Sequence, residues 1–504
     1  MPSNMAKRTS FWLFLIFLCV LGVRLYFAFQ SPEFSTDDAY QVIRQVEHIR
    51  ETGLPLFKDP LLFQAQTSLF LPGYYYVLAA FSFLFPGTMY LKIVPNLFGA
   101  LLVFFAYLLS SAVTKDRTAN LLVALVAGFN PLFFRSTFNS LSIDNLIAPL
   151  LFLLVYLFIK IPSLEQKANA FLLLLVFLLF TTPLVMIFLL GSALFFLLLR
   201  LQKMRVMKGQ VEIVLFSVIL FFWSILIVFK RPFLDLGVSV IWQNIPSPLV
   251  GVFFSAVPPL QIVSLIGIFP LFAGAYAIYR NLFGKPNRQI LLMTAILLGL
   301  VLLLFFHLIQ DSTGFVYFAL FFTLLFGEFV ALADDWFSRT KFAAGKGYFL
   351  LAIVVLSIFS SVVPAVVYAE SALADTPTQT ELDALSWIEQ HTAADSTILV
   401  PLDQASLLQQ KTRRRVVMND DFLSMKDVDE RYADLNTMYT SLYKTNTLSL
   451  MTTYGVDYVL FSPRISRAFN IDSLAYIDER CFTRTYDDGV EVYRVRCRIG
   501  ERDD

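Results

Sequence analysis

Two adjacent carboxylates, Asp37 and Asp38, open a polar segment that directly follows the first apolar run of the chain. An exposed carboxylate has a pKa of about 4 and is ionised at neutral pH, so either side chain can act as a general base. The pattern over 35–52, ending at Gly53, predicts a helix. Thr36 or Asp37 would be its N-cap. A purely structural role for Asp37, at the positive end of that helix, is therefore the alternative.

Four further side chains could contact a substrate. Arg24 lies inside the first apolar run, where an isolated charge is costly and a carboxylate or phosphate partner is expected. Arg135 is a second cation, with contact to lipid headgroups as its alternative role. Asp144 opens another apolar run, as an acid of the site or as a helix N-cap. His307 could contact a phosphate or an acceptor, or be a buried, hydrogen-bonded histidine.

The composition requires that these residues be positioned by membrane helices. Hydrophobic residues make up 57% of the chain, 53 residues are Phe, and only 15% are charged, against about 25% charged in soluble globular proteins. Several apolar runs approach the roughly 20 residues that cross a bilayer as a helix. We predict about eleven spans, at residues 11–29, 89–113, 118–136, 141–160, 168–181, 183–201, 211–229, 258–280, 290–309, 313–332 and 346–368.

Basic residues mark alternate connections between these spans, as expected for cytoplasmic loops. The groups are Lys7/Arg8, Lys115/Arg117, Lys160/Lys167, Arg200/Lys203/Arg205/Lys208, Arg280/Lys285/Arg288 and Arg339/Lys341/Lys346. The N-terminus is therefore predicted inside, and an odd number of spans places the C-terminal part outside. The first run is read as a retained span rather than a cleaved signal. Thr181-Thr182-Pro183 could instead be a kink in one long helix, but the charge alternation argues against it.

Two segments outside the spans are predicted to fold. The apolar stretch 70–86, with Tyr74-Tyr75-Tyr76, is short and is predicted to be an interfacial helix of the first outer loop, 30–88. Residues 370–504 hold 23 acids against 15 Lys and Arg and alternate helical and strand patterns, which predicts a small extracytoplasmic α/β domain after a membrane domain of residues 1–369. Strands are expected at 397–401, 415–418 and 453–461, with a hairpin around Asp487-Asp488-Gly489.

Cysteines and charge limit the remaining possibilities. Cys481 and Cys497 lie near the outer ends of the predicted hairpin strands, so they can form a disulfide outside the cytoplasm or stay as two free thiols. No concentrated basic face suggests nucleic-acid binding. No Walker sequence, dinucleotide-binding turn or nucleophile elbow is present.

The first-loop residues resemble a known family. Asp37-Asp38-Ala-Tyr40 with Arg44 and Gly53, directly after the first span, resembles the first-loop acidic motif of the GT-C superfamily of membrane glycosyltransferases. The tyrosines at 74–76, Pro95, Asn130-Pro131 and Ser142-Ile-Asp144-Asn extend the resemblance. The family uses polyprenyl-phosphate sugars as donors, so it implies membrane lipids and such a donor as partners. The acceptor could be a lipid, a glycan or a protein.

The resemblance implies roles for these residues. Asp38, or else Asp37, would be the catalytic base, and Tyr40, Arg44 and Asp144 would bind substrate. Arg24, Arg135 and His307 are the additional candidates for contacts with the lipid phosphate or acceptor. The resemblance fixes no cofactor; in an oligosaccharyltransferase-like alternative Asp38 and Asp144 would share a divalent cation, Mg²⁺ or Mn²⁺. A transporter or receptor with an outer sensing domain is the non-enzymatic alternative. A transporter would need several charged residues at mid-membrane, whereas most charges here lie at the ends of the predicted spans, and this disfavours it.

Overall fold

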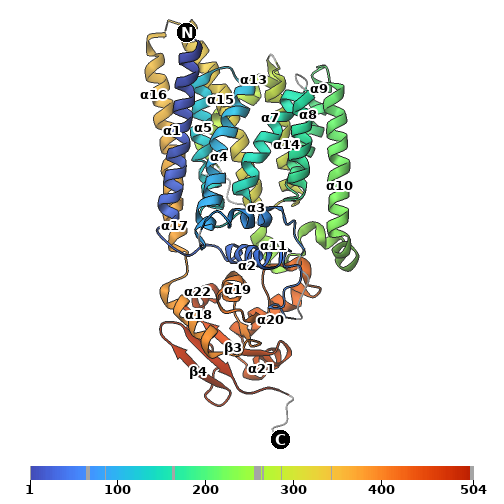
Figure 1. The fold of residues 1–504 in the computed structure, drawn as a ribbon, viewed down its shortest axis with the longest axis vertical. Coiled ribbons are helices and arrows are strands. Elements are labelled where there is room, and N and C mark those ends of the chain that lie inside the picture. The colour runs from blue at the N-terminus through green and yellow to red at the C-terminus, as the bar shows by residue number, and fades with distance from the viewer. Residues whose placement is uncertain are drawn as a thin grey trace. The chain divides into compact units, whose positions relative to one another are not determined.

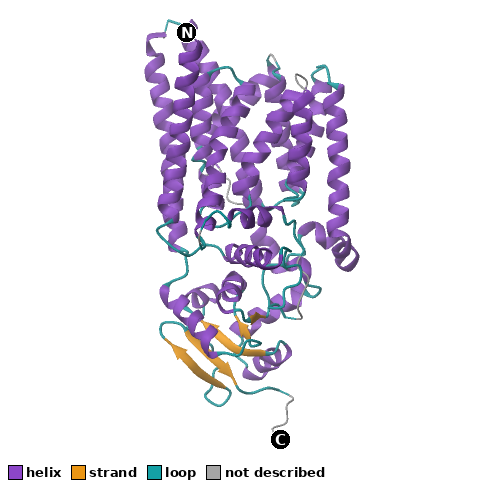
Figure 2. Cartoon of the chain, viewed as in Figure 1, coloured by secondary structure: helices purple, strands orange, loops and turns teal. Residues whose placement is uncertain are grey.

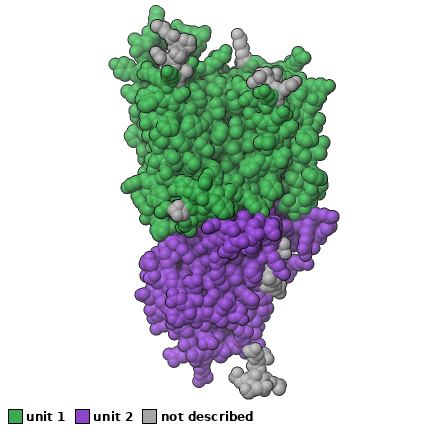
Figure 3. Space-filling model, viewed as in Figure 1, with its two compact units in different colours: residues 1–32, 71–228, 253–374 green, residues 33–70, 229–252, 375–504 purple. Residues whose placement is uncertain are grey.

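The chain divides into two compact units. The computed structural model describes residues 2–63, 69–85, 87–161, 165–254, 263, 266–284, 286–341 and 343–499. The membrane unit consists of residues 1–32, 71–228 and 253–374, and the outer unit of residues 33–70, 229–252 and 375–504 (Figure 3). Most of the predicted first outer loop therefore belongs to the same unit as the C-terminal domain. The predicted division of the chain at 369/370 had assigned this loop to the membrane domain.

Helices build the membrane unit (Figure 1). They are α1 (Pro2–Ala28), α3 (Gly73–Phe81), α4 (Met89–Val113), α5 (Arg117–Gly128), α6 (Pro131–Thr137), α7 (Asp144–Lys160), α8 (Glu165–Leu179), α9 (Val185–Leu201), most of α10 (Lys208–Leu236), α13 (Ile268–Phe283), α14 (Arg288–Phe305), α15 (Asp311–Arg339), α16 (Lys346–Ser357) and α17 (Val363–Ala374), with a π-helical turn at Ile358–Val362 and a 3-10 turn at Ala343–Gly345.

Helix occupies each of the predicted spans. Within the described residues, seven helical segments are long and apolar enough to cross a membrane; α7, α8, α9 and α13 are shorter, so the number eleven stays a prediction. Of the 18-residue apolar stretch within Lys208–Trp242, only 11% is buried, whereas 78% of the corresponding stretch within Arg117–Thr137 is buried. The first segment therefore presents its apolar side chains outward, as a lipid-facing helix does, while the second is interior. Lys285 and the start of the segment at 258–280 lie outside the described residues.

The break at Thr181-Thr182-Pro183 separates two helices rather than kinking one. Helix α8 ends at Leu179 and α9 begins at Val185. Helix α3 has nine residues, too few to span a bilayer, and its first amide, of Gly73, donates to the Phe180 carbonyl at 3.1 Å. The short helix therefore packs against the turn between α8 and α9, as an interfacial element would.

The outer unit combines helices with one sheet (Figure 2). Its helices are α2 (Asp37–Thr52), α11 (Ser247–Phe253), α18 (Gln379–His391), α19 (Leu402–Thr412), α20 (Val428–Thr440), α21 (Lys444–Thr453) and α22 (Pro463–Phe469), with 3-10 turns at Gly237–Trp242 and Phe422–Ser424. Its strands are β1 (Thr397–Leu399), β2 (Arg415–Val416), β3 (Val456–Phe461), β4 (Phe482–Asp487) and β5 (Glu491–Val495).

The sheet has the order β2-β1-β3-β5-β4. Strand β1 pairs in parallel with β2 and β3, whereas β5 pairs antiparallel with β3 and β4. Each predicted strand is confirmed, but α19, α21 and α22 were not predicted. Cys481 and Cys497 form a disulfide across the hairpin, so the paired alternative holds.

Candidate functional site

Helix α2 carries the acidic pair and is fixed at both ends. Thr36 is the N-cap residue but makes no side-chain capping hydrogen bond, while Gly53 ends the helix with φ 78°, a left-handed conformation that glycine adopts without strain. The face bearing Tyr40, Ile43 and Val46 is buried. The predicted helix is confirmed, but the pattern did not show how its acidic end is held.

Asp37 is held by hydrogen bonds from helix α19 of the outer unit. Its Oδ2 accepts the amide hydrogen of Ser406 and its Oδ1 that of Leu407, both at 2.8 Å, in α19. Burial raises the pKa of Asp37 to about 7, although these two hydrogen bonds lower it. Both carboxylate oxygens are engaged, so Asp37 attaches α2 to α19 and does not cap its own helix.

The neighbouring Asp38 differs from Asp37 in its surroundings. It is exposed, and its carboxyl group is within hydrogen-bond contact of Asp420, in the loop after β2. Burial raises the pKa of Asp420 well above its usual range, and the charge of Asp38 raises it further. Asp420 was missed from the sequence because nothing local relates it to the first loop.

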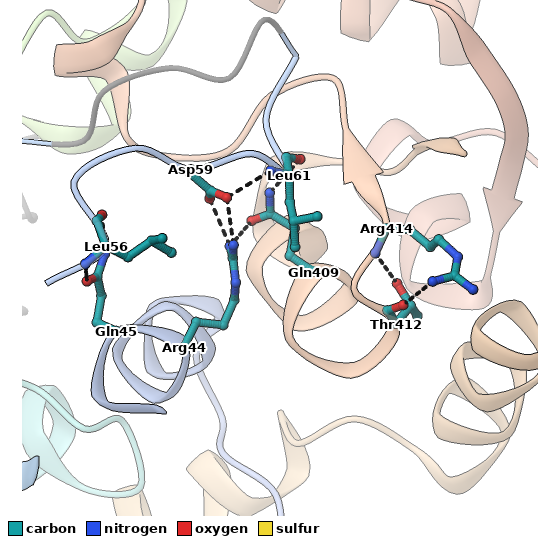
Figure 4. Close-up of polar contacts among 8 residues, drawn as sticks. All are labelled: Arg44, Gln45, Leu56, Asp59, Leu61, Gln409, Thr412 and Arg414. Atoms are coloured by element: carbon teal, nitrogen blue, oxygen red, sulfur yellow. Dashed lines mark hydrogen bonds and ion pairs between the residues drawn. The ribbon is translucent and has the colours of Figure 1, made fainter. Parts of the chain in front are cut away.

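Arg44 is neutralised and buried. Its guanidinium donates to both oxygens of Asp59, at 3.0 and 2.7 Å, and to Gln409 Oε1 at 2.8 Å, and the residue is only 4% exposed. Figure 4 shows this arrangement, with Asp59 also accepting the Leu61 amide hydrogen. Two parallel bonds to one carboxylate are the strongest geometry open to Arg. Arg44 thereby joins α2 to the loop at Asp59 and to α19, and its predicted contact with substrate stays a prediction.

Tyr40 is similarly enclosed. It is 2% exposed, and its hydroxyl lies 3.0 Å from Glu33 Oε2 and 3.2 Å from the amide nitrogen of Phe34. Glu33 in turn pairs with Lys411 of α19 at 2.7 Å. Tyr40 thus joins α2 to the preceding loop through Glu33 and Phe34. Its predicted contact with substrate stays a prediction.

The pKa of Asp37 predicts a pH dependence of stability. The folded protein keeps a proton on Asp37 up to about pH 7, whereas an unfolded Asp loses it near pH 4. Unfolding therefore releases this proton between these values, and the contribution of Asp37 to stability falls as pH rises from about 4 to 7. In chelator, the melting temperature of wild type should fall more over this window than that of Asp37→Asn. Glu51→Gln, on the exposed end of the same helix, should follow wild type; equal slopes for all three proteins would refute the assignment.

In the membrane unit, Arg24 is completely buried. Its Nη2 donates to Thr137 Oγ1 at 2.6 Å and to Asn145 Oδ1 at 3.3 Å, and its guanidinium carbon lies 4.5 Å from the centre of the Phe134 ring. Its Nε has no hydrogen-bond partner among the described residues. Thr137, Asn145 and Phe134 are neutral, so the acidic partner predicted from the sequence is not among these contacts of Arg24. Burying an Arg with neutral partners in a membrane interior is costly, which favours a functional role.

Gly99 of α4 makes room for that guanidinium. A Cβ at this position would lie 2.6 Å from Asn145 Oδ1 and 2.9 Å from the Arg24 guanidinium carbon, whereas a Cβ at Gly22 of α1 would meet nothing within 4 Å. We expect Gly99→Ala to destabilise the protein by about 1–3 kcal/mol through overpacking. Gly22→Ala should be neutral or slightly stabilising. Melting curves of the purified protein in detergent would compare them, and an unchanged Gly99→Ala would contradict the packing.

Asp144 lies at the start of α7 but does not cap it. The N-cap position is Ile143, and Asp144 Oδ1 accepts the hydroxyl hydrogen of Tyr317, from α15, at 2.9 Å. Tyr74 of α3 is buried close to this carboxylate. The N-cap alternative for Asp144 is therefore wrong, and two hydroxyl-bearing side chains that the sequence reading did not select accompany it.

A buried lysine, Lys92 of α4, was also missed. It is 6% exposed, and its Nζ donates to Asn139 Oδ1 at 2.6 Å. Asn139 and Leu141 have φ of 52° and 50°, left-handed values that cost non-glycine residues energy and that cluster at functional sites. A charge near the end of a predicted span was the signal that could have identified Lys92.

Two further predicted residues, both of the membrane unit, are exposed and lie beside aromatic rings. Arg135 of α6 is exposed and its guanidinium carbon lies 5.7 Å from the centre of the Tyr368 ring. His307 is exposed as well, with its ring centre 4.9 Å from that of Phe254, so the buried-histidine alternative is wrong. Their contacts with substrate stay predictions.

Within the described residues, no three His, Cys, Asp or Glu side chains converge as metal ligands would. Asp38 and Asp144 belong to different units, so their proposed sharing of a cation stays a prediction. Two carboxyl groups of the outer unit, Asp38 and Asp420, are in contact.

Comparison with known proteins identifies the fold. No family model and no curated protein sequence matches the chain. The oligosaccharyltransferase AglB from Archaeoglobus fulgidus, solved with an inhibitory peptide and a dolichol-phosphate, matches with a TM-score of 0.66 at 12% identity, over 90% of this chain and 69% of AglB. ArnT from Cupriavidus metallidurans, bound to undecaprenyl phosphate, matches with a TM-score of 0.57 at 13% identity, over 96% of this chain and 98% of ArnT. Both are membrane glycosyltransferases of the GT-C superfamily, and this chain therefore has the GT-C fold.

Proposed function

We propose that this protein is a membrane glycosyltransferase that transfers a sugar from a polyprenyl-phosphate donor to an acceptor hydroxyl on the extracytoplasmic side. The alternation of basic connections supports a cytoplasmic N-terminus and an extracytoplasmic outer unit. The GT-C fold is shared with two proteins that were solved with polyprenyl-phosphate-type lipids, and this supports a donor of that class.

The observation that carries the proposal is the different surroundings of the two acids, Asp37 and Asp38. Asp37 uses both oxygens to hold α19, whereas Asp38 is exposed. Asp38 is therefore the base: its carboxylate takes the proton of the acceptor hydroxyl as the hydroxyl oxygen attacks the anomeric carbon. The bond from that carbon to the phosphate oxygen breaks on the opposite face, so the configuration inverts, and the lipid phosphate leaves with the bonding electrons.

A positively charged side chain is needed to stabilise the negative charge that develops on the leaving phosphate. Lys92 and Arg24 are buried cations of the membrane unit, and we assign the phosphate contact to Lys92 in the first place, because the Arg24 guanidinium is packed between Gly99 and aromatic rings. Lys92→Met should then raise the KM for the lipid donor more than it lowers kcat.

The test uses the full chain in lipid nanodiscs with radiolabelled polyprenyl-phosphate sugars and, separately, polyprenyl-diphosphate glycans. Extracted membranes and peptides supply the acceptors. Transfer from a monophosphate donor supports the proposal. Transfer only from diphosphate glycans would favour an oligosaccharyltransferase, the function of AglB. Absence of transfer from every donor by protein that melts cooperatively would refute an enzymatic role in lipid-linked glycosylation.

A further inference from the structure

The segment that continues helix α10 into the outer unit exposes bulky apolar side chains. Residues 229–252 belong to the outer unit, and their first part completes the continuous helical segment Lys208–Trp242. Leu234 and Val238 are 77% and 69% exposed, and Trp242 is exposed as well. Apolar side chains gathered on an exposed surface mark a place that lipid or a protein partner covers.

These side chains continue the lipid-facing surface of α10. In the predicted span 211–229, exposed bulky side chains recur every three or four residues, at Ile219, Phe222, Trp223, Leu226 and Ile227. The same spacing leads on to Lys230, Leu234, Val238 and Ile241. Because residues three or four apart lie on one face of a helix, the apolar surface of the outer-unit segment extends the surface that faces lipid.

The length of α10 places the end of this helix beyond the hydrocarbon. Its 29 residues span about 44 Å at about 1.5 Å per residue, whereas the hydrocarbon core is about 30 Å thick. Lys230 and Arg231 are exposed near this end, and Arg231 also pairs with Asp235 at 3.8 Å. Basic side chains at the end of a span extend toward lipid phosphates, and Trp is enriched at the same level.

The other end of the segment is fixed to the outer domain. Asn244 is buried and has a left-handed φ of 52°. Its Nδ2 donates to the carbonyl oxygens of Phe422 and Met425 at 2.9 and 2.7 Å. Ser247 Oγ then donates to Asp429 Oδ2, in α20, at 3.2 Å. The segment therefore connects a lipid-facing helix with the loop after β2 and with α20.

We propose that residues 230–242 form a membrane-surface anchor of the outer unit, in which Leu234 and Val238 insert into the outer leaflet. The partner is the lipid surface itself: the apolar side chains contact acyl chains, while Lys230 and Arg231 contact phosphate groups. Direct continuity with the lipid-facing surface of α10 favours lipid over a protein partner. The anchor is independent of the proposed function, and its test needs no sugar donor.

Site-directed spin labelling of the full chain tests the anchor. Cys19→Ala removes the free thiol, and without reductant the Cys481–Cys497 disulfide stays intact, so a nitroxide can be attached to one introduced cysteine. In nanodiscs of phosphatidylcholine and phosphatidylglycerol, electron paramagnetic resonance measures collisions of the label with oxygen, which partitions into lipid, and with a water-soluble nickel chelate.

Val238→Cys should give a ratio of oxygen to nickel collisions several-fold higher than Asp395→Cys, an exposed position of the same unit. Its ratio should approach that of Leu226→Cys, on the lipid-facing surface of α10. Leu442→Cys is the matched apolar control: Leu442 is 75% exposed, but it lies in the connection between α20 and α21, next to no span. It should give the ratio of Asp395→Cys.

Three outcomes overturn the inference. The first is a ratio at Val238 equal to that at Asp395, and the second is equal ratios at Val238 and Leu442. The third is exclusion of both reagents from Val238, which indicates contact with a protein surface such as a second copy of the chain. Leu234→Cys provides an independent position on the same surface and must agree with Val238→Cys. Because both residues are exposed, the melting temperatures of these variants should match that of Cys19→Ala.

Discussion

Asp38→Asn is expected to lower the rate of sugar transfer by about 10²–10⁴-fold, the usual contribution of a general base. The amide is nearly isosteric with the carboxylate but cannot accept the proton of the acceptor hydroxyl. Because Asp38 is exposed, its replacement should leave the melting temperature in chelator close to that of wild type. The measurement is single-turnover transfer from the polyprenyl-phosphate sugar that gives activity.

Asp37→Asn is the matched control for this variant. Its neighbour's carboxylate remains, but one of the two hydrogen bonds from the Ser406 and Leu407 amides is lost, because an amide side chain offers one acceptor oxygen. We expect a lower melting temperature together with a smaller loss of rate. Wild-type rates in both variants would contradict a first-loop base, and a larger loss in Asp37→Asn than in Asp38→Asn would reverse the assignment.

Arg44→Met should destabilise the outer unit by about 3–5 kcal/mol, the usual cost of leaving one member of a buried ion pair unpaired. The Asp59 carboxylate would remain buried with the Leu61 amide hydrogen bond, and Gln409 Oε1 would lose its donor. Unfolding in urea, followed by pulse proteolysis of the full chain with detection of outer-unit fragments, measures the loss.

An exposed ion pair of the same unit provides the comparison. Arg484 pairs with Asp487 at 2.8 Å, with side chains about half exposed, so Arg484→Met should cost no more than about 1 kcal/mol. The double variant Arg44→Met/Asp59→Leu should recover part of the stability lost in Arg44→Met, because no unpaired carboxylate remains. If Arg44→Met cost no more than Arg484→Met, the buried network would not hold the first loop to the outer domain.

The membrane architecture follows largely from local sequence. Apolar runs of span length form helices because a bilayer interior offers no hydrogen-bond partner to the backbone, and each predicted span coincides with helix in the structure. The strands and the hairpin were equally predictable, since alternation and Asp487-Asp488-Gly489 act over a few residues. The short α19 and α22 were not, because such helices depend on packing rather than on periodicity.

The sequence by itself determined that this is a membrane protein with an acidic first loop and a C-terminal α/β domain, because hydropathy, charge and turn chemistry are local properties. Only the tertiary structure decided what each acid does. Asp37 and Asp38 are neighbours of one chemical type, and they differ because Ser406, Leu407 and Asp420 meet them from distant parts of the chain. Burial and hydrogen-bond partners distinguish such residues, and both arise from contacts that no local pattern encodes.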